Sequence, residues 1–246
     1  MKAIILAAGY ATRLHPLTVD RAKALLPVAG RPILDYIADE IDTLEEVDEI
    51  VVVSNHLFIE QFEGWAEDRI RQGGRKQIVL LDDGSTDDSN KLGAIGDMQF
   101  CIDQLQIDED VVIIAGDNLF TYRLADAYAF YRRTGSDTVL GKRIEDKDDL
   151  RRMAVATLGE DGLVLDMVEK PQEPVSDIAI FATYFYNRAT LPLIRVYLDE
   201  GNKPDAPGYF PSWLFKFHEV RAYVFDGECY DIGTPKAYEQ VQALFG

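Results

Sequence analysis

Short apolar runs separated by segments of helical periodicity make up the first half of the chain. Four runs rich in aliphatic residues are too short for helices, so we predict buried strands at residues 3–8, 49–54, 77–81 and 110–115. Apolar residues recur every three or four positions in segments 32–46 and 57–72, which predicts helices, and a further helix is expected to start at the glycines of Leu92–Asp97 and to run to about Leu105. Strands that alternate with helices in this way form parallel sheets with crossover connections.

The pattern changes in the second half, where strands follow one another with fewer helices between them. We predict strands at residues 138–141, 153–158, 163–169, 178–186 and 219–225. Gly159-Glu-Asp-Gly162 predicts a hairpin turn between two of them. The sequence therefore predicts an α/β fold: a Rossmann-like, mostly parallel sheet flanked by helices, with inserted antiparallel strands in the second half.

The loop that follows the first predicted strand is a candidate anion site. Small residues surround Gly9, so backbone N–H groups there can approach a ligand closely, and Arg13 and Lys23 follow. The segment has neither the Gly-x-x-x-x-Gly-Lys-Ser/Thr phosphate loop nor the Gly-x-Gly-x-x-Gly dinucleotide loop. An ordinary tight turn followed by surface cations is the alternative, and the loop alone does not decide between them.

The charge distribution supports a local anion site. Residues 1–31 contain five basic residues and one acid, which gives +4 in a chain whose formal net charge is −18. This patch is too small for a nucleic-acid surface, which needs a broad basic face. We therefore expect no nucleic-acid partner.

Targeting segments and cysteines indicate the compartment of the protein. The few apolar residues before Gly9 are too few for a signal core, and no run approaches the ~20 apolar residues of a membrane span. Cys101 and Cys229 are expected to be reduced thiols in or near the core. We predict a cytoplasmic protein without a membrane partner, and self-association is left open.

Further candidate residues lie at the ends of predicted elements. Gly93, with Gly96, opens a helix whose first N–H groups are expected to be free to bind a ligand. Asp117-Asn118 ends a central strand, and Asp231 stands at a strand-to-helix turn. Two hard oxygen donors beside an anion site would suit Mg²⁺, although a turn that caps the next helix remains the simpler alternative.

These motifs resemble a known family. Leu-Ala-Ala-Gly-Tyr-Ala-Thr-Arg-Leu at residues 6–14, with Lys23 ahead of Leu25-Leu-Pro-Val28, resembles the signature of sugar-phosphate nucleotidylyltransferases. The later motifs occur in the same order as in that family: Leu92-Gly-Ala-Ile-Gly96, Gly116-Asp-Asn118, Glu169-Lys-Pro171, Tyr184-Phe-Tyr186 and Asp231-x-Gly-Thr234. The resemblance covers nearly the whole chain, and glucose-1-phosphate thymidylyltransferases and uridylyltransferases look nearest.

The resemblance implies Mg²⁺-dependent transfer of a nucleotidyl group from dTTP or UTP to a sugar 1-phosphate, giving an NDP-sugar and pyrophosphate. It implies one domain over residues 1–246, with a nucleotide-binding half at 1–135 and a sugar-phosphate-binding half at 136–246. The implied nucleotide-binding residues are Leu6, Ala7, Ala8, Gly9, Arg13, Lys23 and Gly93. The implied catalytic residues are Arg13, Lys23, Asp117 and Lys170, the metal ligands Asp117 and Asp231, and the substrate-binding residues Glu169, Lys170, Ala154 and Thr183.

Some positions depart from the family pattern. Alanine replaces the usual glycine at Ala11, which we expect to be a mild change, and at Ala154 and Ala182 on the acceptor side. An added methyl group at each of the last two positions is expected to crowd a sugar hydroxyl, so the acceptor is left open.

Three other functions make different demands on the sequence. A dinucleotide-dependent oxidoreductase is disfavoured by the missing glycine loop. A non-catalytic nucleotide-sugar-binding regulatory subunit would be expected to lack some of the charged residues named above. A cytidylyltransferase acting on phosphocholine would need an aromatic cage for the quaternary ammonium group, and the aromatic residues between Tyr209 and Phe217 are candidates for it.

Overall fold

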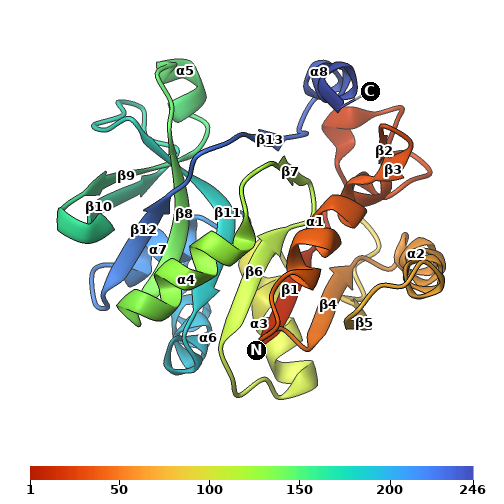
Figure 1. Cartoon of the computed structure of the whole chain (residues 1–246), viewed down its shortest axis with the longest axis horizontal. Helices are drawn as coiled ribbons and strands as arrows, with labels where there is room; N and C mark the ends of the chain where they lie inside the picture. The colour runs from red at the N-terminus through yellow and green to blue at the C-terminus, as the bar shows by residue number, and fades with distance from the viewer. Residues whose placement is uncertain (246) are drawn as a thin grey trace.

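The computed structural model describes residues 1–245 and is organised around a central parallel sheet. Strand β1 (Lys2–Leu6) lies between β4 (Glu49–Ser54) and β6 (Val111–Ala115), and β5 (Gln77–Asp82) extends the sheet beyond β4 (Figure 1). All four strands run parallel. Val and Ile fill β1, β4 and β6, which are covered on both faces and mostly buried, whereas the side chains of the edge strand β5 are at most partly buried.

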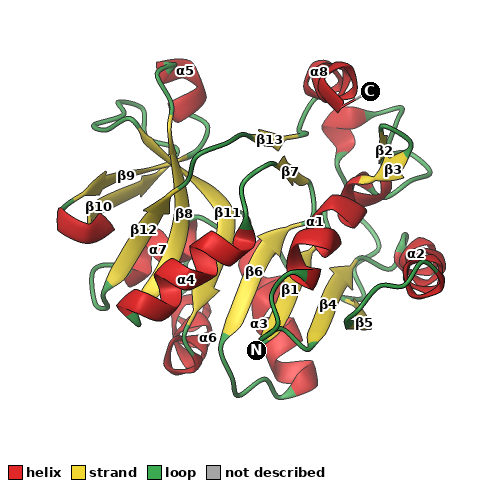
Figure 2. Ribbon diagram, viewed as in Figure 1, coloured by secondary structure: helices red, strands yellow, loops and turns green. Residues whose placement is uncertain are grey.

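Helices cover both faces of this sheet, as Figure 2 shows. Helices α1 (Ile33–Asp42) and α2 (Ile59–Arg71) connect the parallel strands on one side, and α3 (Ala94–Leu105) lies on the other. Side chains alternate along β1, so that Ala3 and Ile5 pack in one core and Ile4 in the second. This three-layer arrangement confirms the α/β fold predicted from the sequence.

The second half of the chain adds antiparallel strands to the same sheet. Strand β11 (Ile178–Tyr186) pairs antiparallel with β6, β8 (Asp137–Arg143) and β9 (Ala154–Leu158), and β9 forms a hairpin with β10 (Val164–Glu169). The register of β11 against β8 shifts between Phe181 and Tyr184. Bulges of this kind bend a strand and often lie beside active sites. The predicted antiparallel insertion is therefore confirmed.

The remaining elements close the fold around this sheet. They are β2 (Pro27–Val28), β3 (Arg31–Pro32), β7 (Asn118–Phe120), α4 (Leu124–Thr134), α5 (Lys147–Leu150), α6 (Leu191–Asp199), α7 (Tyr209–Leu214), β12 (Val220–Val224), β13 (Cys229–Asp231) and α8 (Pro235–Phe245), with short 3₁₀ turns between some of them. No helix within residues 1–245 is both long enough and apolar enough to span a lipid bilayer.

A short pairing between β7 and β13 matters most for the site. Asp231, the last residue of β13, lies opposite Asn118, the first residue of β7 (Figure 1). This pairing places Asp231, from the C-terminal part of the chain, next to the end of β6. The sequence pattern did not predict β7, because a three-residue strand carries too little periodicity to be recognised.

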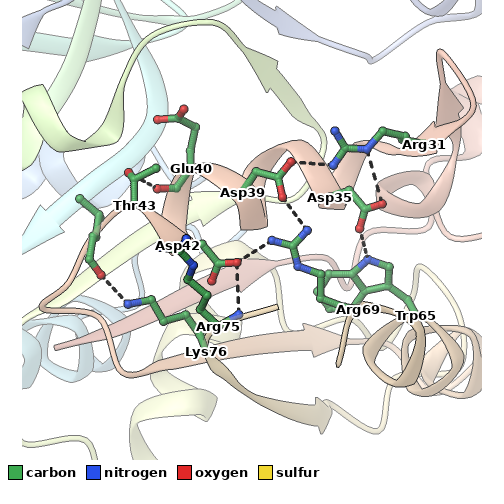
Figure 3. Close-up of polar contacts among 11 residues, drawn as sticks. Arg31, Asp35, Asp39, Glu40, Asp42, Thr43, Trp65, Arg69, Arg75 and Lys76 are labelled. Atoms are coloured by element: carbon green, nitrogen blue, oxygen red, sulfur yellow. Dashed lines mark hydrogen bonds and ion pairs between the residues drawn. The ribbon is translucent and has the colours of Figure 1, made fainter. Parts of the chain in front are cut away.

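An ion-pair network joins α1 to α2 (Figure 3). Arg69, which is buried, donates to Asp39 at 2.6 Å and to Asp42 at 2.8 Å. Asp39 also accepts from Arg31, and the Trp65 indole donates to Asp35 at 2.9 Å. The guanidinium group thus fixes two acidic positions of α1 against α2, and the two arginines hold the pKa of Asp39 below its usual range despite partial burial.

We expect Arg69→Ala to lower the free energy of unfolding by about 2–4 kcal/mol, because it leaves Asp42 poorly solvated and without its partner. The measurement is urea denaturation at pH 7. Arg71→Ala on the same helix is the matched control, since its pair with Asp68 is exposed and should contribute about 0–1 kcal/mol. Equal effects of the two substitutions would contradict a structural role for the network.

Candidate active site

A cavity of about 550 Å³ opens at the carboxyl ends of the parallel strands. The loop after β1, the end of β6 and the start of α3 form one part of its wall, and residues of β9, β10 and β11 form another. Ligands of open α/β sheets bind at this edge of the sheet. The cavity therefore joins residues of both halves of the chain.

The loop after β1 presents small residues and one cation to the cavity. A Cβ atom added at Gly9 would meet no atom within 4 Å, so the space beside this residue is left to a ligand. Ala11 adopts the left-handed conformation, with φ of 48°, and its carbonyl accepts from Thr18 Oγ1 at 2.8 Å. An L-residue is strained in this region, so the replacement of glycine by Ala11 is less mild than the sequence suggested.

Three charged side chains meet at the end of β6. Lys23 Nζ lies 2.5 Å from Asp117 Oδ2 and 3.4 Å from Asp231 Oδ1. Asp117 follows β6 and Asp231 ends β13, so the pairing of β7 with β13 creates the cluster. Arg13 lines the same part of the cavity. The sequence-predicted cations and acids are thus brought together by contacts between distant parts of the chain.

The electrostatics of this cluster show opposing effects. Burial alone would lower the pKa of Lys23, but Asp117 and Asp231 outweigh it, and the pKa is raised. The pKa of Asp231 is also raised, first by the loss of surrounding water and then by Asp117, and Lys23 and Arg13 only partly offset this. The two carboxylates therefore repel each other, and the positive charge of Lys23, which contacts both, offsets part of this repulsion.

The opposite side of the cavity carries a buried acid next to a cation. Burial raises the pKa of Glu169 despite Lys170, whose Nζ lies 3.8 Å from Glu169 Oε1. Lys170 has a φ of 50°, and its N–H donates to the Met153 carbonyl at 3.0 Å. A Cβ atom at Gly208 would lie 2.1 Å from Glu169 Oε2, so a side chain at this position would displace the carboxylate of Glu169.

The start of α3 differs from the sequence-based prediction. The N–H groups of Ala94 and Ile95 donate to the carbonyl groups of Asp205 and Pro204, at 3.3 Å and 2.9 Å. The expectation that these groups are free for a ligand is therefore wrong. Gly93, with φ of 79°, is needed because a Cβ atom there would lie 2.8 Å from the Pro204 backbone. The glycine permits the approach of the 204–205 segment, and Gly93 still lines the cavity.

Comparison with known proteins identifies the family. The family model described as nucleotidyl transferase matches residues 2–245. The chain belongs to the nucleotidyl transferase family. A UTP–glucose-1-phosphate uridylyltransferase, AglF, of Haloferax volcanii is 27% identical over 77% of this chain and 73% of its own length. A glucose-1-phosphate adenylyltransferase of Thermomicrobium roseum is 29% identical over 96% of this chain and 57% of its own length.

A solved structure of UDP-glucose pyrophosphorylase with UDP-glucose has a TM-score of 0.83 at 18% identity, covering 99% of this chain and 97% of that one. This likeness concerns the fold. The chain spans less than two thirds of the length of several curated relatives, for example 62% and 63% in two archaeal ones. The assignment to sugar-phosphate nucleotidyltransferases made from the sequence motifs is confirmed at the level of the family.

Most nucleotidyl-transferase motif residues line the cavity, with one exception on the acceptor side. Leu6, Ala7, Ala8, Gly9, Arg13, Lys23, Gly93, Asp117, Ala154, Glu169, Lys170 and Asp231 all do so. Thr183 does not: its side chain is fully buried and hydrogen-bonds Tyr122 at 2.9 Å. Ala182, one position earlier, reaches the cavity, because neighbouring strand residues point to opposite faces.

Most of the aromatic residues after Tyr209 pack in or against the core, whereas Phe217 is exposed. Phe210 is completely buried and packs edge-on against Tyr186 and Tyr197, with Trp213 beside it. None of the aromatic residues from 209 to 217 is among the residues that line the cavity. The cage that phosphocholine would require is therefore not built from them.

Two contributors to the cavity escaped the sequence analysis. The segment 205–208 lines it, but its Pro/Gly-rich sequence suggests only a loop. Asp97 lines it from the apolar helix α3. The available signal for Asp97 was an acidic residue on the buried side of a helix, where charge is costly without a partner.

We expect Lys23→Met to lower the free energy of unfolding by about 1–2 kcal/mol without divalent ions, because two repelling and partly exposed carboxylates lose their nearest cation. Adding Asp231→Asn should restore part of the loss by removing one of the two like charges. Urea denaturation at pH 7 measures both effects. Lys91→Met, a more exposed cavity lysine, is the control and should change stability little. A double variant less stable than Lys23→Met would refute the repulsion argument.

Proposed function

We propose that this protein transfers a nucleotidyl group from a nucleoside triphosphate to a sugar 1-phosphate, with Mg²⁺, and releases pyrophosphate. The observation that carries the proposal is the single cavity that holds Arg13, Lys23 and the two carboxylates on one side and Lys170 with Glu169 on the other. Two phosphate-bearing substrates can then meet between these groups. The membership in the nucleotidyl transferase family supports the same reaction.

In the proposed reaction, an oxygen of the sugar phosphate attacks the α-phosphorus of the triphosphate. A new P–O bond forms there, and the bond from the α-phosphorus to the bridging oxygen breaks, so that pyrophosphate leaves with the electron pair. A phosphate monoester is largely dianionic at pH 7, since its second pKa is about 6, so the nucleophile needs no general base. Catalysis must instead come from alignment and from charge neutralisation.

The chain's own residues have distinct tasks in this scheme. Arg13 and Lys23 neutralise the triphosphate, whereas Lys170 binds the acceptor phosphate. Glu169, in a confined position beside Gly208, accepts hydrogen bonds from sugar hydroxyls. The combined charge of the substrates is about −6, and three cations offset about half of it. Ala154 and Ala182 line the part of the cavity that we assign to the sugar, and their methyl groups make it narrower than glycine would. Which sugar fits there is a question for experiment.

The carboxylates fit a divalent ion. Asp117 and Asp231 both approach the Lys23 ammonium group, so their oxygens already converge on one positive charge. Residues 1–245 contain no set of three His, Cys, Asp or Glu side chains that could hold a metal. This matches Mg²⁺, which keeps few protein carboxylates and takes its other ligands from water and phosphate. When bound, Mg²⁺ would neutralise phosphate charge, and Lys23 would then be released to the triphosphate.

The nucleobase of the donor and the location of the protein are also proposals. The resemblance favours dTTP or UTP, but the relatives' names include uridylyl, adenylyl, thymidylyl and guanyl transferases, so membership in the family does not fix the base. A regulatory subunit without activity is less well supported, because the cations and both carboxylates are present. We also propose a cytoplasmic location. Pyrophosphate release from a grid of five nucleoside triphosphates and a panel of sugar 1-phosphates tests the function directly.

We expect Asp117→Ala and Asp231→Ala each to reduce Mg²⁺-dependent pyrophosphate release by at least 100-fold, because each removes a proposed ligand of the ion. Circular dichroism should show an intact fold. Asp108→Ala, which removes an exposed acid paired with Arg188 ahead of β6, is the control and should retain activity. Near-normal release by either active-site variant would overturn the metal assignment.

We expect Lys170→Ala to raise KM for the sugar phosphate at least tenfold and KM for the nucleotide less than threefold. Loss of a charge-assisted hydrogen bond to phosphate costs about 1.5–3 kcal/mol. Initial-rate kinetics with each substrate varied separately give both values, and Lys216→Ala, at an exposed lysine after α7, serves as the control. A larger effect on the nucleotide would place Lys170 on the other substrate.

A further inference from the structure

The segment 204–208 runs along the cavity from the start of α3 to the end of β10. Its first two carbonyl groups accept hydrogen bonds from the first two N–H groups of α3. Its last residue, Gly208, lies against Glu169, the last residue of β10. Residues 205–208 all line the cavity. The segment therefore connects the side of the cavity that we assign to the nucleotide with the side that we assign to the acceptor.

Gly93 determines where the first end of the segment lies. It has a φ of 79°, and a Cβ atom there would lie 2.8 Å from both the carbonyl carbon and the carbonyl oxygen of Pro204. An ion pair adds to this contact, because Lys91 Nζ lies 3.9 Å from Asp205 Oδ1. The backbone of the segment thus packs directly on the backbone before α3, and a side chain at position 93 would push the two apart.

Gly208 determines the space that is left to the Glu169 carboxylate. A Cβ atom there would lie 2.1 Å from Glu169 Oε2 and 3.3 Å from the Cβ atom of Ala154. The Glu169 side chain is only 7% exposed, so it has little room to move away. The Gly208 carbonyl accepts from Ser212 Oγ at 2.8 Å, and Phe210 of the same helix α7 is completely buried. The carboxylate therefore yields more readily than this end of the segment.

Two prolines limit how the segment can respond to a displacement. The φ angles of Pro204 and Pro207 are fixed by their rings, so the short stretch between the two ends has few free rotations. One end is held by α3 and the other by α7. A shift of Pro204 must therefore change the path of residues 205–207, which line the cavity next to Gly208 and Glu169.

We propose that the segment 204–208 positions Glu169 for the acceptor, with Gly208 as the positioning residue and Gly93 controlling the segment from the nucleotide side. This inference rests on the proposed function, in which Glu169 binds sugar hydroxyls. Gly208 acts through the carboxylate of Glu169 and not through a contact of its own with the reacting atoms. A residue on the nucleotide side of the cavity thus affects the affinity for the acceptor.

Initial-rate kinetics of the whole chain, with each substrate varied separately, test the role of Gly208. Gly208 has a φ of −69°, which alanine adopts without strain, so Gly208→Ala adds only a methyl group. We expect KM for the sugar phosphate to rise at least tenfold, because the displaced carboxylate loses its hydrogen bonds to the sugar. KM for the nucleotide should rise less than threefold, and circular dichroism should show an intact fold.

A double-variant cycle separates positioning of Glu169 from a general disturbance of the cavity. In a Glu169→Ala background no carboxylate remains for the methyl group to displace. Adding Gly208→Ala there should change kcat/KM for the sugar phosphate less than threefold, although it lowers this value at least tenfold in the natural protein. Equal losses in the two backgrounds would overturn the positioning role.

Gly93→Ala tests the connection from the nucleotide side. We expect it to raise KM for the sugar phosphate at least fivefold, because the new methyl group displaces Pro204. Gly30→Ala is the matched control, since Gly30 has the same φ of 79° but a Cβ atom there would meet no atom within 4 Å. Both KM values of the control should stay within twofold of the natural protein. A rise of Gly93→Ala confined to KM for the nucleotide would overturn the connection.

The results distinguish this inference from the function on which it rests. Normal pyrophosphate release with an unchanged KM for the sugar phosphate in Gly208→Ala would overturn the inference and leave the transferase standing. Absence of release by the natural protein with every pair of substrates would refute the transferase and the inference with it. Should Gly208→Ala not fold, the KM values of Gly93→Ala decide in the same way.

Discussion

The site depends on the attraction of one ammonium group for two carboxylates that repel each other. Lys23 is separated from Asp117 by 94 residues and from Asp231 by 208 residues, yet its Nζ approaches both. Like charges repel each other, and Asp117 contributes to the raised pKa of Asp231. The β7–β13 pairing is a ladder of three residue pairs, and Leu119 and Phe120 of β7 are buried in the core. The strand pairing thus brings the two acids together, and the cation offsets their repulsion.

The two carboxylates can face a positive charge both without and with a bound substrate. Without substrate, the protein supplies its own positive charge to the acids. A divalent ion with a triphosphate would bring a stronger charge to the same oxygens and would return the lysine to the phosphates. Because the chain has a net charge of −18, the proposed binding of a polyphosphate would depend on the cations gathered at the cavity.

Features that a short stretch of sequence determines were predictable, and those that depend on packing were not. The aliphatic run of β1 and the helical periodicity of α1 need no distant information. Gly93 was correctly singled out, but the reason was wrong, because its partner Pro204 lies far along the chain. Thr183 and Ala182 show the same limit: their strand was predicted, but which of the two reaches the cavity depends on which face of the sheet carries the cavity. Asp97 was missed because its place at the cavity depends on the packing of α3.

Two cavity residues at or beside a cation have a strained backbone. Ala11 and Lys170 have φ values of 48° and 50°, in a region that costs an L-residue about 1–2 kcal/mol. Each is held by hydrogen bonds from outside its own turn: Thr18 fixes the carbonyl of Ala11, and the Met153 carbonyl fixes the N–H of Lys170. Arg13 lies two residues after the first, and Lys170 is the second. Ala29, Gln106 and Asp161 have the same backbone conformation outside the cavity, so a positive φ does not by itself mark the site. What the two cavity residues share is that contacts from elsewhere in the chain fix the backbone at or beside a cation, which limits where that cation can lie.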